Sequence, residues 1–239
     1  MNPIIKINDL VKQFPVGKGN FTALNGLNIE FGEGEFAGLV GPSGSGKTTL
    51  LNIIGSLDTP SSGTALVMGK SIGELTHKQS ADLRNRYIGF IFQTFNLLPV
   101  YTVYENVEFA LLLQKMTSAE RHKSVMDALE WVGLTDKVKS KPSMLSGGES
   151  QRVAIARAMV KKPKIVLADE PTANLDSKNS HHILQTMKKL NEELKVTFIF
   201  ATHDEKVMMY LDRIVNLEDG KIVSDEKLSA ERRAQNASI

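Results

Sequence analysis

Residues 41–49 read Gly-Pro-Ser-Gly-Ser-Gly-Lys-Thr-Thr and match the phosphate-loop pattern G-x-x-x-x-G-K-[ST]. Lys47 can reach the β- and γ-phosphates of a nucleotide, and the Thr48 hydroxyl can ligate Mg²⁺. The glycines allow backbone angles and a close approach that a Cβ atom would prevent. A glycine turn with a chance lysine is the alternative. The residues expected to bind phosphate are Gly41, Pro42, Ser43, Gly44, Ser45, Gly46, Lys47, Thr48 and Thr49.

The residues around this loop predict a strand before it and a helix after it. Residues 36–40 form a short apolar run that is typical of a buried strand. Residues 48–54 are apolar enough to begin a helix. A strand, a glycine loop and a helix N-terminus together direct consecutive backbone N–H groups at a phosphate chain, so the context favours nucleotide binding.

A second apolar run, residues 165–168, is followed by the carboxylates Asp169 and Glu170. Neighbouring strand residues point to opposite faces, so the two side chains can have different tasks. Asp169 can hold Mg²⁺ through water beside Thr48, and Glu170 can polarise an attacking water. A solvated carboxylate pair at a strand end is the alternative, but the upstream phosphate loop makes it the weaker one.

Residues 145–151 read Leu-Ser-Gly-Gly-Glu-Ser-Gln and precede a helical run. Ser146 and Glu149 match the capping box S-x-x-E, so the stretch predicts at least a helix start. Gly147 and Gly148 leave the N–H groups of that start unobstructed, which makes a second place for phosphate. Because one nucleotide needs only one such start, the sequence suggests that two chains share a nucleotide.

Two polar residues follow runs that predict strands. Gln93 comes after the aromatic run 87–92, and its amide could reach Mg²⁺ or the attacking water. His203 comes after the run 196–201, where a neutral imidazole could donate to a γ-phosphate oxygen. A surface glutamine and a structural or solvated histidine are the alternatives, and the expected position of both residues on the nucleotide side of the sheet weighs against them.

The chain of 239 residues is expected to be one α/β domain with a mainly parallel sheet, an antiparallel β subdomain near the N-terminus and an inserted helical subdomain. We assign the nucleotide-binding core with its β subdomain to residues 1–95 and 160–225, the helical subdomain to 96–159 and a tail to 226–239. Strands are expected at 3–14 and 22–31, joined by a loop at 15–20, and at 64–68; helices at 74–86, along 96–143 and at 177–194; and a hairpin at 214–223 that turns near Asp219 and Gly220, followed by a short helix after Ser224.

The composition excludes several classes of protein. There is no cysteine, so disulfides, thiolate chemistry and cysteine zinc sites are excluded. The net charge of +2 gives no argument for nucleic acid. No run approaches 18 apolar residues and residues 1–6 lack a secretory apolar segment, so we expect a cytosolic protein that reaches a membrane only through a partner. Phe95, Leu97 and Leu98 are unusually apolar for a loop and would belong either to the core or to a docking surface.

In this order the motifs resemble those of the ATP-binding subunit of an ABC transporter, and the resemblance covers nearly the whole chain. Phe14 corresponds to the aromatic residue that stacks on adenine, with Phe21 as a nearby competitor. Glu149 departs from the family, which often has glutamine there, but glutamate suits a helix start and no loss of function is expected. The remaining correspondences are residues 41–49 with the Walker A loop, Gln93 with the Q-loop, 145–151 with the LSGGQ-type signature, 165–170 with the Walker B strand, 173–176 with the D-loop and His203 with the switch histidine.

The resemblance implies the ABC ATPase fold, which is a P-loop NTPase core, and hydrolysis of ATP with Mg²⁺ by a head-to-tail homodimer. It implies integral membrane permease subunits as partners, at the cytoplasmic face of the cell membrane. Thr48, Gln93 and Asp169 would order the metal. Glu170 would orient water and His203 would steady the γ-phosphate. Residues of the second copy would cover that phosphate: Ser146, Gly147, Gly148 and Glu149.

Residues 23–26, 89–99 and 105–107 further resemble the group of lipoprotein-releasing, macrolide-exporting and cell-division ATPases. Two other classes stay open. A DNA-repair or chromosome-organising ATPase usually has long coiled-coil or zinc insertions, which this sequence lacks together with any basic stripe, so no nucleic-acid partner is expected. An ATP-dependent regulatory scaffold of a cell-division assembly would hydrolyse ATP slowly, and the sequence does not give the rate.

Overall fold

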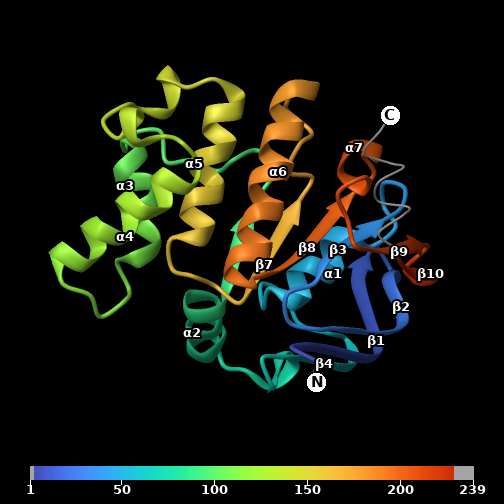
Figure 1. Cartoon of the computed structure of the whole chain (residues 1–239). Coiled ribbons are helices and arrows are strands. Elements are labelled where there is room, and N and C mark those ends of the chain that lie inside the picture. The colour runs from blue at the N-terminus through green and yellow to red at the C-terminus, as the bar shows by residue number, and fades with distance from the viewer. Residues whose placement is uncertain (1–2, 229–239) are drawn as a thin grey trace.

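The computed structural model describes residues 3–228, which form two sheets and seven α-helices (Figure 1). The smaller sheet has the strand order β2-β1-β4-β5 and the larger one the order β10-β9-β3-β8-β7-β6. Their strands are β1 (Ile5–Val16), β2 (Gly19–Phe31), β3 (Phe36–Val40), β4 (Ser62–Val67), β5 (Lys70–Ser71), β6 (Ile88–Ile91), β7 (Ile165–Asp169), β8 (Thr197–Thr202), β9 (Arg213–Glu218) and β10 (Lys221–Lys227).

The small sheet is antiparallel and is built around a long hairpin. Strands β1 and β2 stay paired as far as Val16 and Gly19, so their turn contains only Gly17 and Lys18. The expected loop at 15–20 is therefore wrong, because a two-residue turn lets strand pairing continue almost to the tip. Gly17 has a φ of +59°, a left-handed conformation that glycine adopts without steric cost.

The large sheet is parallel except at one edge, as the sequence predicts. Strand β3 lies between β8 and β9 and pairs with both in parallel, and β8 pairs in parallel with β7. Only β10 runs antiparallel, to its neighbour β9. The carboxyl ends of β3, β8 and β7 therefore meet at one edge of the sheet, which is where ligands bind in such folds.

Helices cover both faces of this sheet, and α3, α4 and α5 together form a helical lobe on one side of the molecule (Figure 1). Helix α1 packs against the face of the large sheet that is on the side of the small sheet. Helices α5 and α6 cover the opposite face of the large sheet. The helices are α1 (Lys47–Ile54), α2 (His77–Tyr87), α3 (Val103–Glu108), α4 (Ser118–Trp131), α5 (Gly147–Met159), α6 (Ser177–Leu194) and α7 (Glu205–Met208). Short 3₁₀ turns lie at Ile72–Glu74, Phe109–Leu111, Thr135–Lys137 and Pro142–Met144.

Residues 96–143 are less helical than expected. Residues 96–102 form no helix, and α3 and α4 are separated by turns. Asn106 stabilises this segment because its buried amide accepts from Leu98 N (2.7 Å) and donates to three carbonyl oxygens of residues 98–102. Backbone groups of the non-helical segment are thus satisfied by one side chain of α3.

The C-terminal hairpin turns at Asp219 and Gly220, as predicted, with φ values of +46° and +72°. Strand β10 continues to Lys227, so the expected helix after Ser224 is wrong for residues 225–227. Pairing with β9 and the bidentate contact of Asp225 with Arg213 (2.7 Å for each nitrogen) stabilise the extended form. Residues 229–239 of the predicted tail lie outside the described residues. No helix within residues 3–228 is both long and apolar enough to cross a membrane.

Candidate functional site

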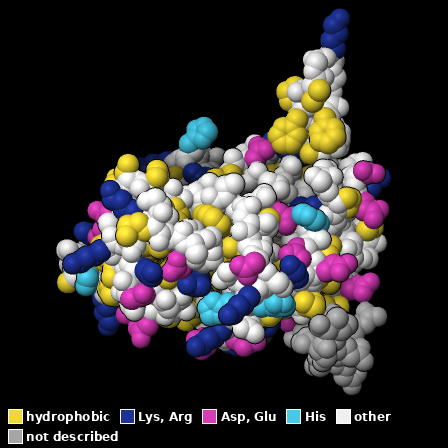
Figure 2. Space-filling model, turned by 90° about the horizontal axis from the view of Figure 1, so that it is seen from above, with side chains coloured by type: hydrophobic (Ala, Val, Ile, Leu, Met, Phe, Trp, Pro, Cys, Tyr) yellow, Lys and Arg dark blue, Asp and Glu magenta, His cyan; other side chains and the backbone are white. Residues whose placement is uncertain are grey.

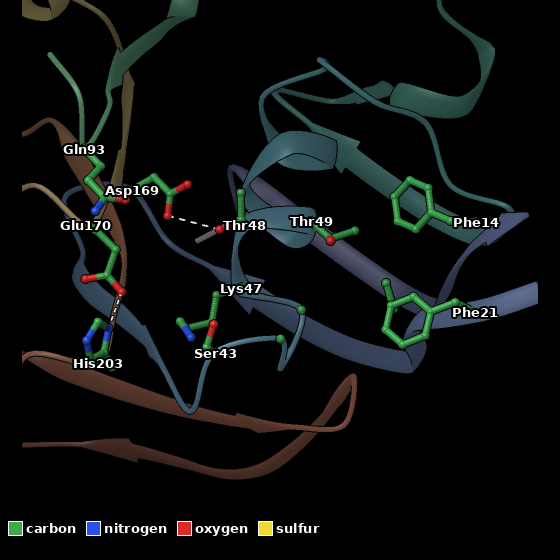
Figure 3. A pocket seen from close by; sticks show the side chains of 13 residues that line it. Phe14, Phe21, Ser43, Lys47, Thr48, Thr49, Gln93, Asp169, Glu170 and His203 are labelled. Carbon is green, nitrogen blue, oxygen red and sulfur yellow. Dashed lines mark hydrogen bonds and ion pairs between the residues drawn. The ribbon is translucent and has the colours of Figure 1, made fainter. Parts of the chain in front are cut away.

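A pocket with a volume of about 480 Å³ opens at the carboxyl ends of β3, β7 and β8 (Figure 3). Most of the residues that the sequence singles out line it, and Phe21 and Ala23 join them. Its lining residues are Phe14, Phe21, Ala23, Ser43, Gly44, Gly46, Lys47, Thr48, Thr49, Gln93, Asp169, Glu170 and His203. The predicted residues that do not line it are Gly41, Pro42, Ser45, Ser146, Gly147, Gly148 and Glu149.

The glycine loop folds as tightly as its sequence suggests. Gly41, Gly44 and Gly46 all have positive φ values, of +155°, +83° and +102°. A Cβ atom at Gly41 would lie 2.1 Å from Leu217 O, and one at Gly46 would lie 2.6 Å from Ala23 O. Nothing lies within 4 Å of a Cβ position at Gly44, which faces the pocket. Two glycines are therefore required by packing and the third leaves room for a ligand.

Lys47 is held inside the loop by two carbonyl groups. Its Nζ donates to Gly41 O at 2.7 Å and to Pro42 O at 2.8 Å, and the residue is 7% exposed. Burial lowers the pKa of Lys47, and the nearby carboxylates of Glu170 and Asp169 oppose that change. The ammonium group is thus positioned before a ligand arrives, in a site whose poor solvation strengthens its attraction for an anion.

Thr48 and Asp169 form the part of the pocket suited to a cation. Thr48 Oγ1 donates to Asp169 Oδ1 at 3.2 Å, and Gln93 lies on the same side of the pocket (Figure 3). Burial is the main cause that raises the pKa of Asp169, and the neighbouring charge of Glu170 adds to it. A divalent cation would compensate this charge. Within residues 3–228 no three His, Cys, Asp or Glu side chains cluster as metal ligands.

Glu170 is held by three interactions at the ends of β7 and β8. Its Oε1 lies 2.6 Å from His203 Nδ1, its Oε2 accepts from Thr202 Oγ1 at 3.1 Å, and its N–H donates to Ala201 O at 2.9 Å. Glu170 has a φ of +45°, which is uncommon for a residue with a side chain. Backbone strain of this kind is concentrated at functional sites and persists only where the surroundings impose it.

The contact with Glu170 decides which nitrogen of His203 carries a proton. A carboxylate only accepts, so Nδ1 is the protonated nitrogen and a neutral ring leaves Nε2 as an acceptor. The neutral imidazole expected to donate to a phosphate can therefore do so through Nδ1 only after leaving Glu170. Donation through Nε2 requires a second proton on the ring.

Two phenylalanines form the other end of the pocket (Figure 3). Phe14 and Phe21 are opposite each other on β1 and β2, and they are 37% and 54% exposed. This hairpin projects from the body of the molecule; hydrophobic side chains gather on the lower part of the projection, and a basic side chain lies at its end (Figure 2). Lys12 Nζ lies 5.0 Å from the centre of the Phe14 ring. Two exposed aromatic faces beside a phosphate loop can stack with a planar base.

The segment around Gln93 is tied to two distant parts of the chain. Its carbonyl accepts from Asn174 Nδ2 at 2.7 Å. Phe95 and Asn96 have positive φ values, and their carbonyls accept from Nη2 and Nη1 of Arg157 at 2.6 and 2.5 Å. Arg157 lies in α5, and nothing in its sequence context indicates this task. Phe95 and Leu97 are half-buried, and Leu97 packs against the core.

The glycine-containing start of α5 lies outside the pocket, but its predicted capping box forms. Ser146 Oγ accepts from Glu149 N at 3.3 Å, and Glu149 Oε2 accepts from Ser146 N at 2.8 Å. Glu149 also lies 3.4 Å from Lys137 Nζ. These hydrogen bonds lower the pKa of Glu149. A Cβ atom at Gly148 would lie 2.5 Å from Asn179 Oδ1 in α6, so a side chain at position 148 would displace Asn179.

Three comparisons with known proteins agree with one another. A family model described as ABC transporter matches residues 24–173. The chain is 46% identical over 224 residues to the uncharacterized ABC transporter ATP-binding protein YvrO of Bacillus subtilis, a match that covers 94% of this chain and 97% of YvrO. It is 42% identical over 225 residues to the lipoprotein-releasing system ATP-binding protein LolD of Geobacter metallireducens, covering 94% and 100%.

A solved structure is also similar over nearly its whole length. It is the dimeric post-hydrolysis state of the ATP-binding cassette MJ0796 of Methanocaldococcus jannaschii, bound to ADP and Pi. The TM-score is 0.87 and the sequence identity 42%, and the match covers 95% of this chain and 99% of that one. The similarity therefore extends over the complete length of these relatives.

Proposed function

Since this chain belongs to the ABC transporter ATP-binding family and is an ATPase, we propose a mechanism on that premise. Two copies close head to tail on ATP and drive a conformational change in separate membrane subunits. The process served would be export, lipoprotein release or mechanotransmission across the membrane. LolD is named for lipoprotein release and is 42% identical to this chain, which favours that group of processes.

One observation carries the shared-site part of this proposal. The phosphate loop and the residues after β7 and β8 line one pocket, whereas the start of α5, from Ser146 to Glu149, lies outside that pocket. A helix start with accessible N–H groups that lies outside its own nucleotide pocket can serve the pocket of a second copy. The dimeric state described for MJ0796 supports this arrangement.

Each residue of the pocket has one proposed task. Lys47 and the loop amides hold the phosphates, and Phe14 stacks on adenine, with Phe21 completing the aromatic end. Mg²⁺ would be ordered by Thr48, Asp169 and Gln93 and would neutralise the developing charge on the phosphates. The phosphate-covering residues of the second copy are Ser146, Gly147, Gly148 and Glu149.

Glu170 orients the attacking water for in-line displacement, and His203 then steadies the γ-phosphate. Because Glu170 and His203 contact each other at 2.6 Å, the two proposed roles require that ATP and water separate them. Closure of the dimer excludes bulk water and strengthens every electrostatic contact inside the site. Catalysis would come mainly from positioning and electrostatics.

The membrane subunits would dock on the lobe of α3, α4 and α5. A cavity of about 270 Å³ lies there between Phe90, Phe92, Phe109 and Arg157, beside the segment that follows Gln93. Phe109 is 51% exposed. A docking surface there would lie next to the segment that follows the pocket residue Gln93, so the partner would sense ATP binding. The proposed location is the cytoplasmic face of the membrane. The proposed division of the chain is a nucleotide-binding core of residues 1–95 and 160–225 and a helical subdomain of residues 96–159.

The proposal is tested with Glu170→Gln, which keeps the size of the side chain and removes its charge. Turnover should fall by about 10²- to 10⁴-fold, the usual contribution of a general base. Light scattering after gel filtration should show a dimer with ATP and a monomer with ADP. Hydrolysis at the parent rate would exclude the role of Glu170, and a monomer at saturating ATP would exclude the shared site.

An ATP-dependent regulatory scaffold of a cell-division assembly is the second candidate. The observation in its favour is the 2.6 Å contact of His203 with Glu170, because it engages the proposed base. A scaffold would dimerise with ATP but show turnover near zero, with and without its membrane partner. Purification of the complex in mild detergent and an ATPase assay would separate the two functions.

A further inference from the structure

A buried glutamine links the start of α5 to the residue next to the proposed base. Gln151 lies one turn into α5, is 0% exposed, and its Nε2 donates to Pro171 O at 2.7 Å. Pro171 directly follows Glu170. The side chain of Gln151 therefore fixes the carbonyl of Pro171, the residue that follows the strained backbone of Glu170, where φ is +45°.

The other half of the Gln151 amide is unsatisfied. Its Oε1 is buried and has no hydrogen-bond partner. Only the amide nitrogen can donate to a carbonyl, so the bond to Pro171 O sets the orientation of the amide and leaves Oε1 unpaired. A buried, unpaired polar atom weakens the folded state, and each such atom in a native protein calls for an explanation. Apolar packing alone would be served as well by leucine or methionine.

We propose that Gln151 is a positioning residue for Glu170 of its own chain. It anchors the carbonyl of Pro171, the residue after Glu170, to helix α5 and so keeps the carboxylate of Glu170 directed into the pocket. This inference rests on the proposed shared site. In that dimer the tip of α5 covers the nucleotide of the second copy, so Gln151 connects the base of one site to the helix that closes the other.

Mixed dimers test this proposal because the working site takes its Glu170 from one chain and its α5 from the other, and each chain can be changed separately. The reference is one native chain paired with one Glu170→Gln chain, purified with two affinity tags in the presence of ATP. This dimer has one working site, formed by Glu170 of the native chain and α5 of the variant chain. Gln151→Met, similar in length but without the amide, is then placed on either chain.

With Gln151→Met on the chain that retains Glu170, turnover should fall by about fivefold or more, the lower limit of typical coupling between sites. ATP binding by the separate chain should stay within about twofold. With Gln151→Met on the Glu170→Gln chain, turnover should equal that of the reference. Both dimers contain the same substitutions, so a general loss of packing would slow both equally.

Equal turnover of the two mixed dimers would overturn the proposal, as would a loss only when Gln151→Met shares a chain with Glu170→Gln. Thermal unfolding of each variant checks that it is folded, and Gln151→Leu replaces Gln151→Met if the latter is not. Failure of the reference dimer to form with ATP would instead count against the shared site itself. The two failures are therefore distinguishable.

Discussion

Helices α1 and α5 both begin beside glycines and are both proposed to face phosphate, yet their first turns are built differently. Helix α1 begins after Gly46, whose φ is +102°, and no side chain caps it. Helix α5 begins after Ser146, and its capping box with Glu149 satisfies donors of the first turn within the chain. The first turn of α1 contains Lys47 and no acid, whereas that of α5 contains Glu149.

This difference fits the proposed dimer, in which the start of α1 in one copy and the start of α5 in the other share one nucleotide. An uncapped helix start leaves its N–H groups for an anion, and the positive end of the helix dipole favours negative charge there. The capped start of α5 keeps fewer free donors and carries a carboxylate. In the proposed dimer, α1 would therefore hold phosphate alone, while α5 would complete a site that the phosphate loop has already formed.

The other helix starts support this distinction. Thr76, Thr102 and Thr117 form the same reciprocal box at α2, α3 and α4, and Asp176 caps α6. Asp204 caps α7 as well, so a side-chain cap is the rule among the α-helices of residues 3–228, and α1 departs from it. The departure coincides with the glycine loop, where a capping side chain would occupy the space of a phosphate.

The largest expected effect comes from removing the charge at the start of α1. Lys47→Ala should weaken ATP binding by the single chain about 10- to 100-fold, because a hydrogen bond to a charged group is lost. Titration calorimetry in a Glu170→Gln background measures this without hydrolysis. Lys137→Ala, which removes the lysine beside α5, is the matched control and should leave the affinity unchanged. Equal losses in both variants would contradict the comparison.

The cap of α5 should matter to dimerisation with ATP and not to the ATP affinity of the single chain. Ser146→Ala should lower the free energy of unfolding by about 0.5–2 kcal/mol through loss of the cap and should weaken dimerisation with ATP by about tenfold. ATP affinity of the single chain should be unchanged. Light scattering at several ATP concentrations measures the dimer, and Thr117→Ala removes the equivalent cap of α4. If Thr117→Ala weakens the dimer as much, stability alone accounts for the effect.

The carboxylate of α5 should oppose the phosphate of the second copy. Glu149→Gln keeps the acceptor for Ser146 N and removes the charge, so less ATP should be needed for dimerisation, by about two- to fivefold. The gain should shrink with added salt, because screening weakens interactions between partly exposed charges. Glu120→Gln, at the same position of α4, should have no effect. A weaker dimer with Glu149→Gln would mean that the carboxylate stabilises the closed state.

The smallest expected effect is a pH dependence confined to α5. Hydrogen bonds from Ser146 lower the pKa of Glu149 in the folded chain, and an unfolded glutamate titrates near about 4.3. The stabilisation is therefore full above that pH and is lost as the pH falls through the lower, folded pKa. Native protein should exceed Glu149→Gln in stability by about 0.3–1 kcal/mol at pH 7, and the difference should shrink at acid pH, as the pH falls through the lowered pKa of folded Glu149. Urea unfolding at pH 7 and at acid pH measures this, and a constant difference would exclude the cap carboxylate as its source.

Much of the fold followed from local pattern. Apolar runs predicted β3, β7 and β8, and the family and fold expected from the ordered motifs are confirmed by the relatives and the similar dimeric structure. The 96–143 region was less predictable, because the apolar spacing of its α-helices also continues through loops. There the backbone is satisfied by Asn106, a side chain whose partners cannot be inferred from neighbours in sequence.

The residue types at the pocket were determined by the sequence alone: a glycine loop with Lys47 and Thr48, and carboxylates after a buried strand. Their meeting followed from parallel strand ends, which is a general consequence of the fold. Only the tertiary structure decided that Glu170 contacts His203, that Arg157 holds the segment after Gln93, and that Gln151 reaches Pro171. These contacts join residues 20 to 62 positions apart, and side-chain geometry at such separations depends on how helices pack against the sheet, not on local pattern.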